Sequence, residues 1–176
     1  SSNYEGNIIA IGSPGNDENG EGAGCVKVFE WNDSNWIQLG QNIYGEAVLN
    51  GPGLGDQAGN TISLNNDGTR LTIGAPTHDA LEDDNDYDSG YVRIFNWNAN
   101  TQFWEQVGGD IQGEYQELTA YDESLDINGN GNIVAVGGYL TNTENGIWSG
   151  RVRIFQEDAN ATGNYLGWSQ MGSDIN

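Results

Sequence analysis

The chain repeats itself three times, and this repeat limits the possible folds more than any other feature of the sequence. The run NIIAIGS recurs as TRLTIGA and NIVAVGG, and its glycines Gly12, Gly74 and Gly137 are spaced 62 and 63 residues apart. A period of about 60 residues is too long for a solenoid coil and too regular for a single sandwich. We therefore expect one repeat region over residues 1–176, with approximate repeats 1–59, 60–122 and 123–176.

Each repeat contains short apolar runs with the alternation of β-strands. Val26 and Val28 flank Lys27, and Val92 and Ile94 flank Arg93. No stretch has helical periodicity over three turns, so we predict antiparallel strands, four per repeat, and no helix beyond single turns. The first repeat lacks its first strand, which we expect to be absent or supplied from outside the chain. The strand residues expected to be buried are Ile9, Ile11, Val26, Val28, Ile73, Val92, Ile94, Ile133, Val134, Val136, Val152 and Ile154.

The composition excludes some partners. Twenty-six acidic residues against five basic ones leave a formal charge of −21. Nucleic acid and anionic membranes are therefore not expected as binding partners, because phosphate binding needs a basic surface. Cationic partners and divalent ions fit better. No apolar run approaches the length of a membrane helix, and the single cysteine, Cys25, can form no disulfide within the chain and is expected to be buried.

The repeat motifs resemble those of FG-GAP, integrin-α-like β-propeller repeats, in particular an acidic secreted type built on a Trp-Gln-Gly and Ile-Gly-Glu pattern. The segments that carry the resemblance are 11–14 (IGSP), 73–76 (IGAP), 36–46, 104–114 and 55–68. The third repeat departs from the pattern with VGGY at 136–139. The resemblance implies an all-β fold of antiparallel four-stranded propeller blades. Closed propellers have about 4 to 8 blades, so three repeats imply a partial propeller or part of a larger one, completed by further repeats or copies.

In such propellers the connection after the second strand and the connection between consecutive blades leave from one face, which would bring acidic loops together. The candidate metal ligands are Asp84, Asp86, Asp88, Asp17, Asn19 and Glu21. Their alternate spacing suits calcium, which takes about six to eight oxygens. Residues 84–95 resemble the start of a helix-flanked calcium loop, but Gly90 comes one place late and Phe95 stands where a closing Glu is needed. Two interpretations stay open, namely a calcium site and a solvated acidic loop.

Tryptophans recur at one position of the repeat. Trp36, Trp104 and Trp168 are equivalent, and a repeated aromatic in a propeller predicts packing between adjacent blades. Trp148 has no counterpart in the other repeats and lies in a connection on the expected binding face. We interpret it as the candidate ligand-contacting residue.

Two sequons, at Asn32 and Asn160, follow equivalent strands and are candidate glycosylation sites. The single histidine, His78, is interpreted as an ordinary loop residue. No nucleophile elbow and no histidine-containing metal motif is present. Carboxylate pairs such as Glu114 and Glu117 could serve a glycosidase, but with 26 acidic residues some pair is inevitable.

These features predict a non-catalytic, extracellular recognition or adhesion module, secreted or at the cell surface, that presents acidic loops in a calcium-dependent way. Its expected partner is a protein or glycan at the cell surface or in the extracellular matrix. The alternative is a structural subunit of an extracellular filament or large surface complex. A second alternative is a glycan-processing enzyme.

Overall fold

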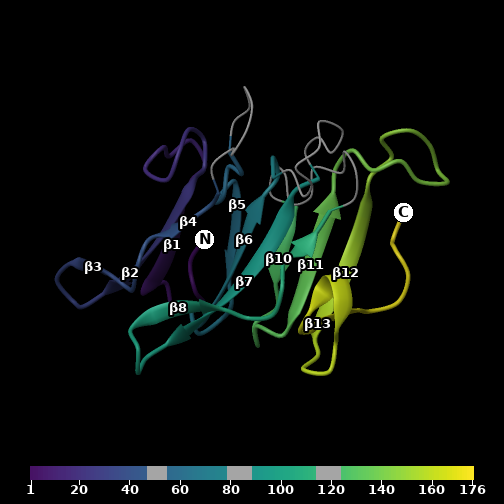
Figure 1. The fold of residues 1–176 in the computed structure, drawn as a ribbon. Coiled ribbons are helices and arrows are strands. Elements are labelled where there is room, and N and C mark those ends of the chain that lie inside the picture. The colour runs from purple at the N-terminus through teal and green to yellow at the C-terminus, as the bar shows by residue number, and fades with distance from the viewer. Residues whose placement is uncertain (47–54, 79–88, 114–123) are drawn as a thin grey trace.

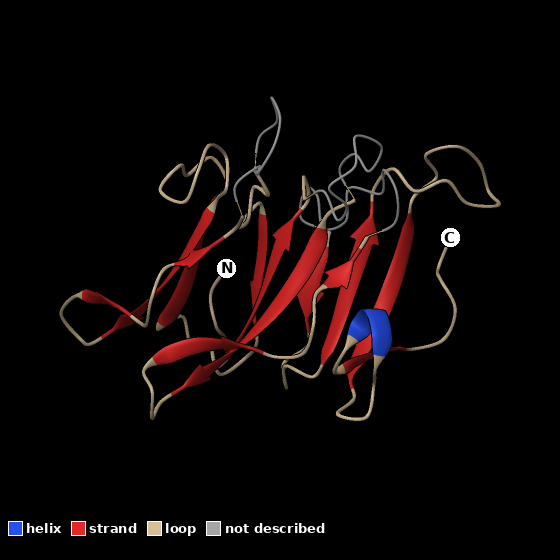
Figure 2. Ribbon diagram, in the orientation of Figure 1, coloured by secondary structure: helices blue, strands red, loops and turns tan. Residues whose placement is uncertain are grey.

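The protein is all-β. The computed structural model describes residues 1–46, 55–78, 89–113 and 124–176, and these form three antiparallel sheets of four or five strands (Figures 1 and 2). The single helical element among the described residues is one 3-10 turn, η1, over Gly163–Tyr165. This confirms the coarser part of the predicted fold class, an all-β fold of antiparallel sheets. In the described part of the chain, no helix is long and apolar enough to cross a membrane.

The three sheets follow one another along the sequence, one per repeat. Sheet I contains β1 (Ile8–Ser13), β2 (Cys25–Trp31), β3 (Trp36–Gln38) and β4 (Ile43–Tyr44). Sheet II contains β5 (Thr61–Leu64), β6 (Arg70–Ala75), β7 (Tyr91–Asn98), β8 (Phe103–Gln106) and β9 (Ile111–Gln112). Sheet III contains β10 (Leu125–Ile127), β11 (Ile133–Gly138), β12 (Arg151–Glu157) and β13 (Trp168–Gln170).

Within each sheet the strands are ordered as they occur in the sequence, so each repeat is a meander. The exceptions are β4 and β9, which return to pair with β2 and β7. Sheet I has no complete strand before β1 in the described residues. Instead Ser2 forms one antiparallel bridge with Ile9, and the Ala10 amide donates to the Ser1 carbonyl at 3.0 Å. The first residues of the chain therefore lie beside β1, in the position of the missing first strand. The sequence predicts that this strand is absent or comes from outside the chain.

Two apolar cores hold the sheets together, one on each side of sheet II. The core between sheets I and II includes Val26, Val28 and Ile73, and the core between sheets II and III includes Ile94 and Val134. Alternate residues of β7 supply opposite cores, with Tyr91 and Phe95 on one side and Val92 and Ile94 on the other, because successive side chains of a strand point to opposite faces. Among the described residues, sheet II is thus covered on both faces, whereas sheets I and III are each covered by a neighbouring sheet on one face only.

The burial prediction was wrong at two positions. Ile11 and Val152 are exposed, although the other strand residues predicted to be buried are buried or half-buried. Ile11 lies on the face of sheet I that points away from sheet II, and Val152 lies on the face of sheet III that points away from sheet II. The apolar pattern correctly identifies both residues as strand residues on an apolar face. In the part of the chain that the structure describes, however, no sheet covers that face. Cys25 is buried, as expected.

Candidate functional site

Five longer connections leave from one edge of the three sheets. The strand pairing requires this, because Ser13 lies opposite Cys25, Ala75 opposite Tyr91 and Gly138 opposite Arg151. The connections span residues 14–24, 45–60, 76–90, 113–124 and 139–150. The turns that follow β2, β5, β7, β10 and β12 lie at the opposite edge (Figure 1). We call the first edge the loop edge.

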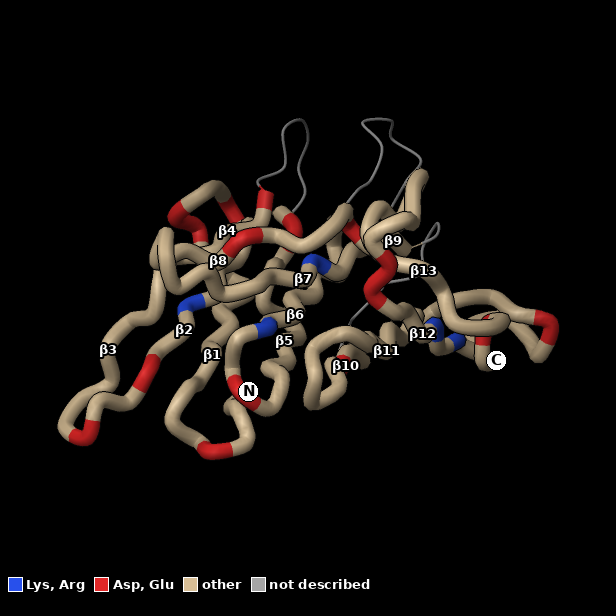
Figure 3. Tube along the Cα trace, turned by 90° about the horizontal axis from the view of Figure 1, so that it is seen from below, with Lys and Arg blue, Asp and Glu red and all other residues tan. Residues whose placement is uncertain are grey.

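The loop edge is strongly acidic. Sixteen of the 26 acidic residues and none of the five basic ones fall within the five connections. All five basic residues are instead on strands: Lys27 on β2, Arg70 on β6, Arg93 on β7, and Arg151 and Arg153 on β12. Figure 3 shows these basic positions within the body of the sheets. No basic side chain of the connections themselves can therefore offset their carboxylates.

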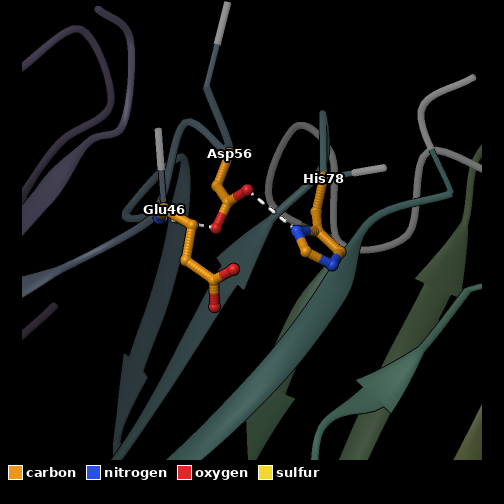
Figure 4. A group of neighbouring side chains, drawn as sticks. All are labelled: Glu46, Asp56 and His78. Carbon is orange, nitrogen blue, oxygen red and sulfur yellow. Dashed lines mark hydrogen bonds and ion pairs between the residues drawn. The ribbon is translucent and has the colours of Figure 1, made fainter. Parts of the chain in front are cut away.

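A buried carboxylate joins three separate segments at the loop edge. The side chain of Asp56, 6% exposed, comes from the connection between β4 and β5. Its Oδ2 accepts hydrogen bonds from the Glu46 amide at 2.7 Å and from the Tyr91 hydroxyl at 2.8 Å. Its Oδ1 lies 2.8 Å from Nδ1 of His78, which follows β6 (Figure 4). We call Glu46, Asp56, His78 and Tyr91 the Asp56 cluster.

Arg93 connects the Asp56 cluster to the next carboxylate along sheet II. Its Nη2 lies 2.6 Å from Oε1 of Glu46, and its Nη1 donates to the Tyr91 hydroxyl at 3.0 Å. Its Nε and Nη2 bind the two oxygens of Asp110 at 2.9 and 2.8 Å. This two-pronged geometry fixes the planar guanidinium between sheets I and II.

Charge and burial shift the pKa values of this region in consistent directions. Burial lowers the pKa of His78, but the hydrogen bond and negative charge of Asp56, aided by Glu46, outweigh burial, so the pKa is raised. Burial, followed by the negative charge of Asp56, raises the pKa of the Tyr91 hydroxyl far above its usual range. Burial raises the pKa of Asp110, but its hydrogen bonds and ion pair with Arg93 outweigh this and hold it below its usual range. Histidine is the side chain whose ordinary pKa lies closest to neutral pH, so a raised pKa of His78 has consequences in the physiological range.

The raised pKa of His78 makes a pH-dependent contribution to stability. A histidine whose pKa is higher in the folded state stabilises the fold fully below its unfolded pKa of about 6.5, and that stabilisation disappears as the pH rises through the folded value. We expect the difference in melting temperature between wild type and His78→Gln to be largest below pH 6.5 and to shrink above the folded pKa. Thermal melts of both proteins across pH 5.5–9 measure it, with NMR titration of the His78 ring as the direct check. A difference that grows with pH would contradict the expected direction.

Glu46, Asp56 and His78 each offer a ligand atom, and these atoms lie within 4.8 Å of one another. Among the described residues this is the one such group of three or more. A nitrogen and two carboxylates suit zinc or another transition metal rather than calcium, which prefers oxygen ligands alone. However, both Asp56 oxygens already accept protein hydrogen bonds, and Arg93 occupies the Glu46 carboxylate. The contacts that are present join the two loops to sheet II and leave little ligand capacity for an ion.

The residues predicted as metal ligands fall in two connections. Asp84, Asp86 and Asp88 lie outside the described residues. In the connection between β1 and β2, Oδ1 of Asp17 accepts the Gly22 amide at 2.8 Å, and the Asn19 side chain donates to the Gly45 carbonyl at 2.8 Å.

Asp17 and Glu21 line an open hollow of about 360 Å³ together with Gly22 and Gln57. The hollow offers two carboxylates, whereas calcium takes about six to eight oxygens. Further oxygens from water or from other loops would be needed to complete a calcium shell there.

The other predicted site residues are exposed. Trp148 is on the loop edge, in the connection between β11 and β12, and its amide donates to the Asn142 side chain at 2.9 Å. Asn32 and Asn160 are at the opposite edge, in the turns that follow β2 and β12. The Asn32 side chain accepts the Asn35 amide at 2.9 Å, which closes its turn. Both sequon asparagines are thus accessible from solvent and remote from the loop edge.

The sequence offered little sign of the Asp56 cluster. His78 was interpreted as an ordinary loop residue, and Asp56 lies 22 residues before it. Asp56 lies in segment 55–68, one of the segments that carry the resemblance to propeller repeats, but no motif connects it with His78. The one available signal was that Asp56 and Glu46 are the only acidic residues in a glycine-rich connection.

No protein-family model matches the chain, and no curated protein sequence matches it. Function is therefore inferred from the residues and their geometry.

Proposed function

We propose that the three sheets are blades of an integrin-α-like, FG-GAP-type β-propeller and that the protein is a non-catalytic extracellular recognition module. The loop edge binds a protein or glycan partner at the cell surface or in the extracellular matrix, with calcium bridging the acidic loops. One observation carries the proposal: five connections from three sheets leave from a single edge and hold sixteen acidic residues and no basic one.

The arrangement of the strands supports a propeller. Each repeat orders its strands from first to last across the sheet, as propeller blades do. The first strands of neighbouring repeats approach one another, since β5 contacts β1 on one side and β10 on the other. Contacts of this kind between the innermost strands are expected if the sheets fan out from a common axis.

The charge of the loop edge favours recognition of cationic groups. Clustered carboxylates in connections that contain no basic residue create a negative potential that attracts cations and raises their rate of association. The attraction between exposed charges weakens as salt is added, because the screening length falls from about 10 Å at 0.1 M to about 3 Å at 1 M. A partner bound in this way should therefore dissociate at high salt unless calcium ions bridge the two surfaces.

Calcium binding tests the metal part of the proposal. Titration of calcium into chelator-treated protein is expected to release or absorb heat, and a concentration 100 times Kd should stabilise the fold by about 2.7 kcal/mol. The ligands are oxygens of the acidic connections, so the combined variant Asp84→Asn, Asp86→Asn and Asp88→Asn should lose the effect. Neutralising Glu30, Asp33 and Glu105, which are away from the loop edge, removes the same charge and should preserve it.

The outcome separates this function from its alternatives. A structural subunit that binds nothing small would show no heat and no shift in melting temperature at about millimolar calcium, the range of extracellular calcium modules. Turnover on a panel of polysaccharides would instead favour the glycan-processing enzyme. Either result would contradict a calcium-dependent recognition module.

A further inference from the structure

Neighbouring sheets are joined by one repeated contact. The indole of Trp104, on β8 of sheet II, donates from Nε1 to the carbonyl of Leu39 in sheet I at 2.9 Å. The indole of Trp168, on β13 of sheet III, donates in the same way to the carbonyl of Val107 in sheet II at 3.0 Å. These two tryptophans are 3% and 1% exposed. Sheets II and III therefore each insert a tryptophan against the residue that follows the outer strand of the preceding sheet.

The glycine after each accepting carbonyl makes room for the inserted ring. A Cβ added to Gly40 would lie 2.7 Å from Trp97 and 2.9 Å from Trp104. A Cβ added to Gly108 would lie 2.3 Å from the Leu166 carbonyl and 2.9 Å from Trp168. Only glycine fits, because such distances are shorter than real Cβ contacts. The carbonyl and the glycine together form a socket.

A third copy of this socket is open. Met171 and Gly172 of sheet III correspond to Leu39 and Gly40, and to Val107 and Gly108, in the repeat. Gly172 has the same left-handed conformation, with φ +74° against +81° and +76°, yet a Cβ added to it would meet nothing within 4 Å. Met171 is 43% exposed.

Apolar residues beside the open socket are uncovered as well. Ile175 is 60% exposed, whereas the equivalent Ile43 and Ile111 are buried between sheets. Val152 is also exposed, although the equivalent Val26 and Val92 are fully buried. We call Val152, Met171, Gly172 and Ile175 the socket face.

The tryptophan that corresponds to Trp104 and Trp168 is exposed in sheet I, the sheet farthest from the open socket. Trp36 of sheet I occupies the repeat position of Trp104 and Trp168 but is 42% exposed. Ile11, on the same face, is 48% exposed, whereas its counterparts Ile73 and Val136 are buried between sheets. We call Ile11, Phe29 and Trp36 the knob face.

We propose that the knob face of one copy of this protein docks on the socket face of a second copy, with Trp36 Nε1 donating to the Met171 carbonyl. The two faces carry the residues that already pack against each other at both contacts between sheets within the chain. The closed ring rests on the propeller architecture proposed above: two copies related by a twofold axis use all four faces and place six sheets in one ring. Six lies within the about 4 to 8 blades of closed propellers, and a closed ring leaves no such face exposed.

The charge of the protein decides the conditions under which the pair forms. Each copy carries a formal charge of −21, so two copies repel each other at low salt. The proposed contact is mainly apolar and is not weakened by screening. Association should therefore strengthen between about 0.05 and 0.5 M salt, because the screening length shortens over this range.

Sedimentation equilibrium with two complementary variants tests the contact. Trp36→Ser removes the knob, and Met171→Asp places a charge in the socket; both positions are exposed, so the fold should survive. The wild-type chain of 19.0 kDa should sediment as a pair. Each variant alone should associate at least about 30-fold more weakly, as expected for the loss of a central tryptophan anchor worth 2 kcal/mol or more. The control Phe103→Ser removes an aromatic of similar exposure outside both faces and should pair like wild type.

Mixing the two variants gives the sharpest result. Trp36→Ser retains the socket and Met171→Asp retains the knob, so an equimolar mixture should recover a one-to-one pair through one intact contact. A mixture that stays monomeric would overturn the proposal, as would a monomeric wild type at every concentration and salt tested. Masses that rise without limit would overturn the closed pair. Circular dichroism of each variant verifies the fold, and either variant alone still tests self-association if the other fails to fold.

Discussion

Replacing Asp56 by alanine is expected to lower the free energy of unfolding by about 3–5 kcal/mol, the usual cost of removing one partner from a buried charged network. Three donors depend on this carboxylate: the Glu46 amide, the Tyr91 hydroxyl and His78. Tyr91 is buried, so its hydroxyl cannot turn to bulk water when the carboxylate is removed. Urea denaturation of the variant and of wild type measures the difference.

Asp17→Ala is the matched control for this experiment. Asp17 lies at the same loop edge and caps its own turn through one hydrogen bond, to the Gly22 amide, but its side chain is exposed. We expect a loss of at most about 1 kcal/mol, typical of a single exposed hydrogen bond. If the two variants lost equal stability, the Asp56 cluster would not be what holds the loops to sheet II.

Replacing Ile73 by alanine is expected to cost about 2–5 kcal/mol, whereas Ile11→Ala should cost less than about 1 kcal/mol. The two residues are the same amino acid at the same position of the repeat. Ile73 is buried in the core between sheets I and II, where truncation leaves a cavity, and Ile11 is on the open face of sheet I. Urea denaturation of both variants gives the comparison.

The measurement is made in the Trp36→Ser background so that association of two copies does not add to the stability of the fold. Equal losses at both positions in this monomeric background would mean that the open face of sheet I is covered by other residues of the same chain. In the wild-type background, by contrast, Ile11→Ala should weaken the proposed pair.

Both results bear on how the protein combines a rigid body with the loop edge, for which we propose a binding function. The sheets are held by apolar contacts between their faces, and the loops are held by polar contacts at one edge. Truncating an apolar residue between sheets changes the stability of the whole body. Changing an exposed loop carboxylate, such as Glu21, should affect binding with little effect on stability.

The local structure of the strands and the repetition of this structure along the chain could be predicted from the sequence alone. Alternation around Lys27 and Arg93 placed β2 and β7, because side chains on successive strand residues point to opposite faces. The equivalence of Trp36, Trp104 and Trp168 identified the packing position, and the structure confirms it for Trp104 and Trp168. These properties depend on neighbours within a few residues, or on comparison of one repeat with the next.

Two properties could be seen only in the tertiary structure: which apolar faces are covered by another sheet, and which polar side chains form hydrogen bonds with one another. The pattern of Ile11 is that of Ile73, but one is exposed and the other buried, because alternation shows that two residues share a face and not whether another sheet lies on it. The meeting of Asp56 with His78 depends on the paths of two long connections, for which no periodic rule exists. The burial of a side chain and the partners of a carboxylate are set by segments distant in the sequence, and they exist only once those segments pack together.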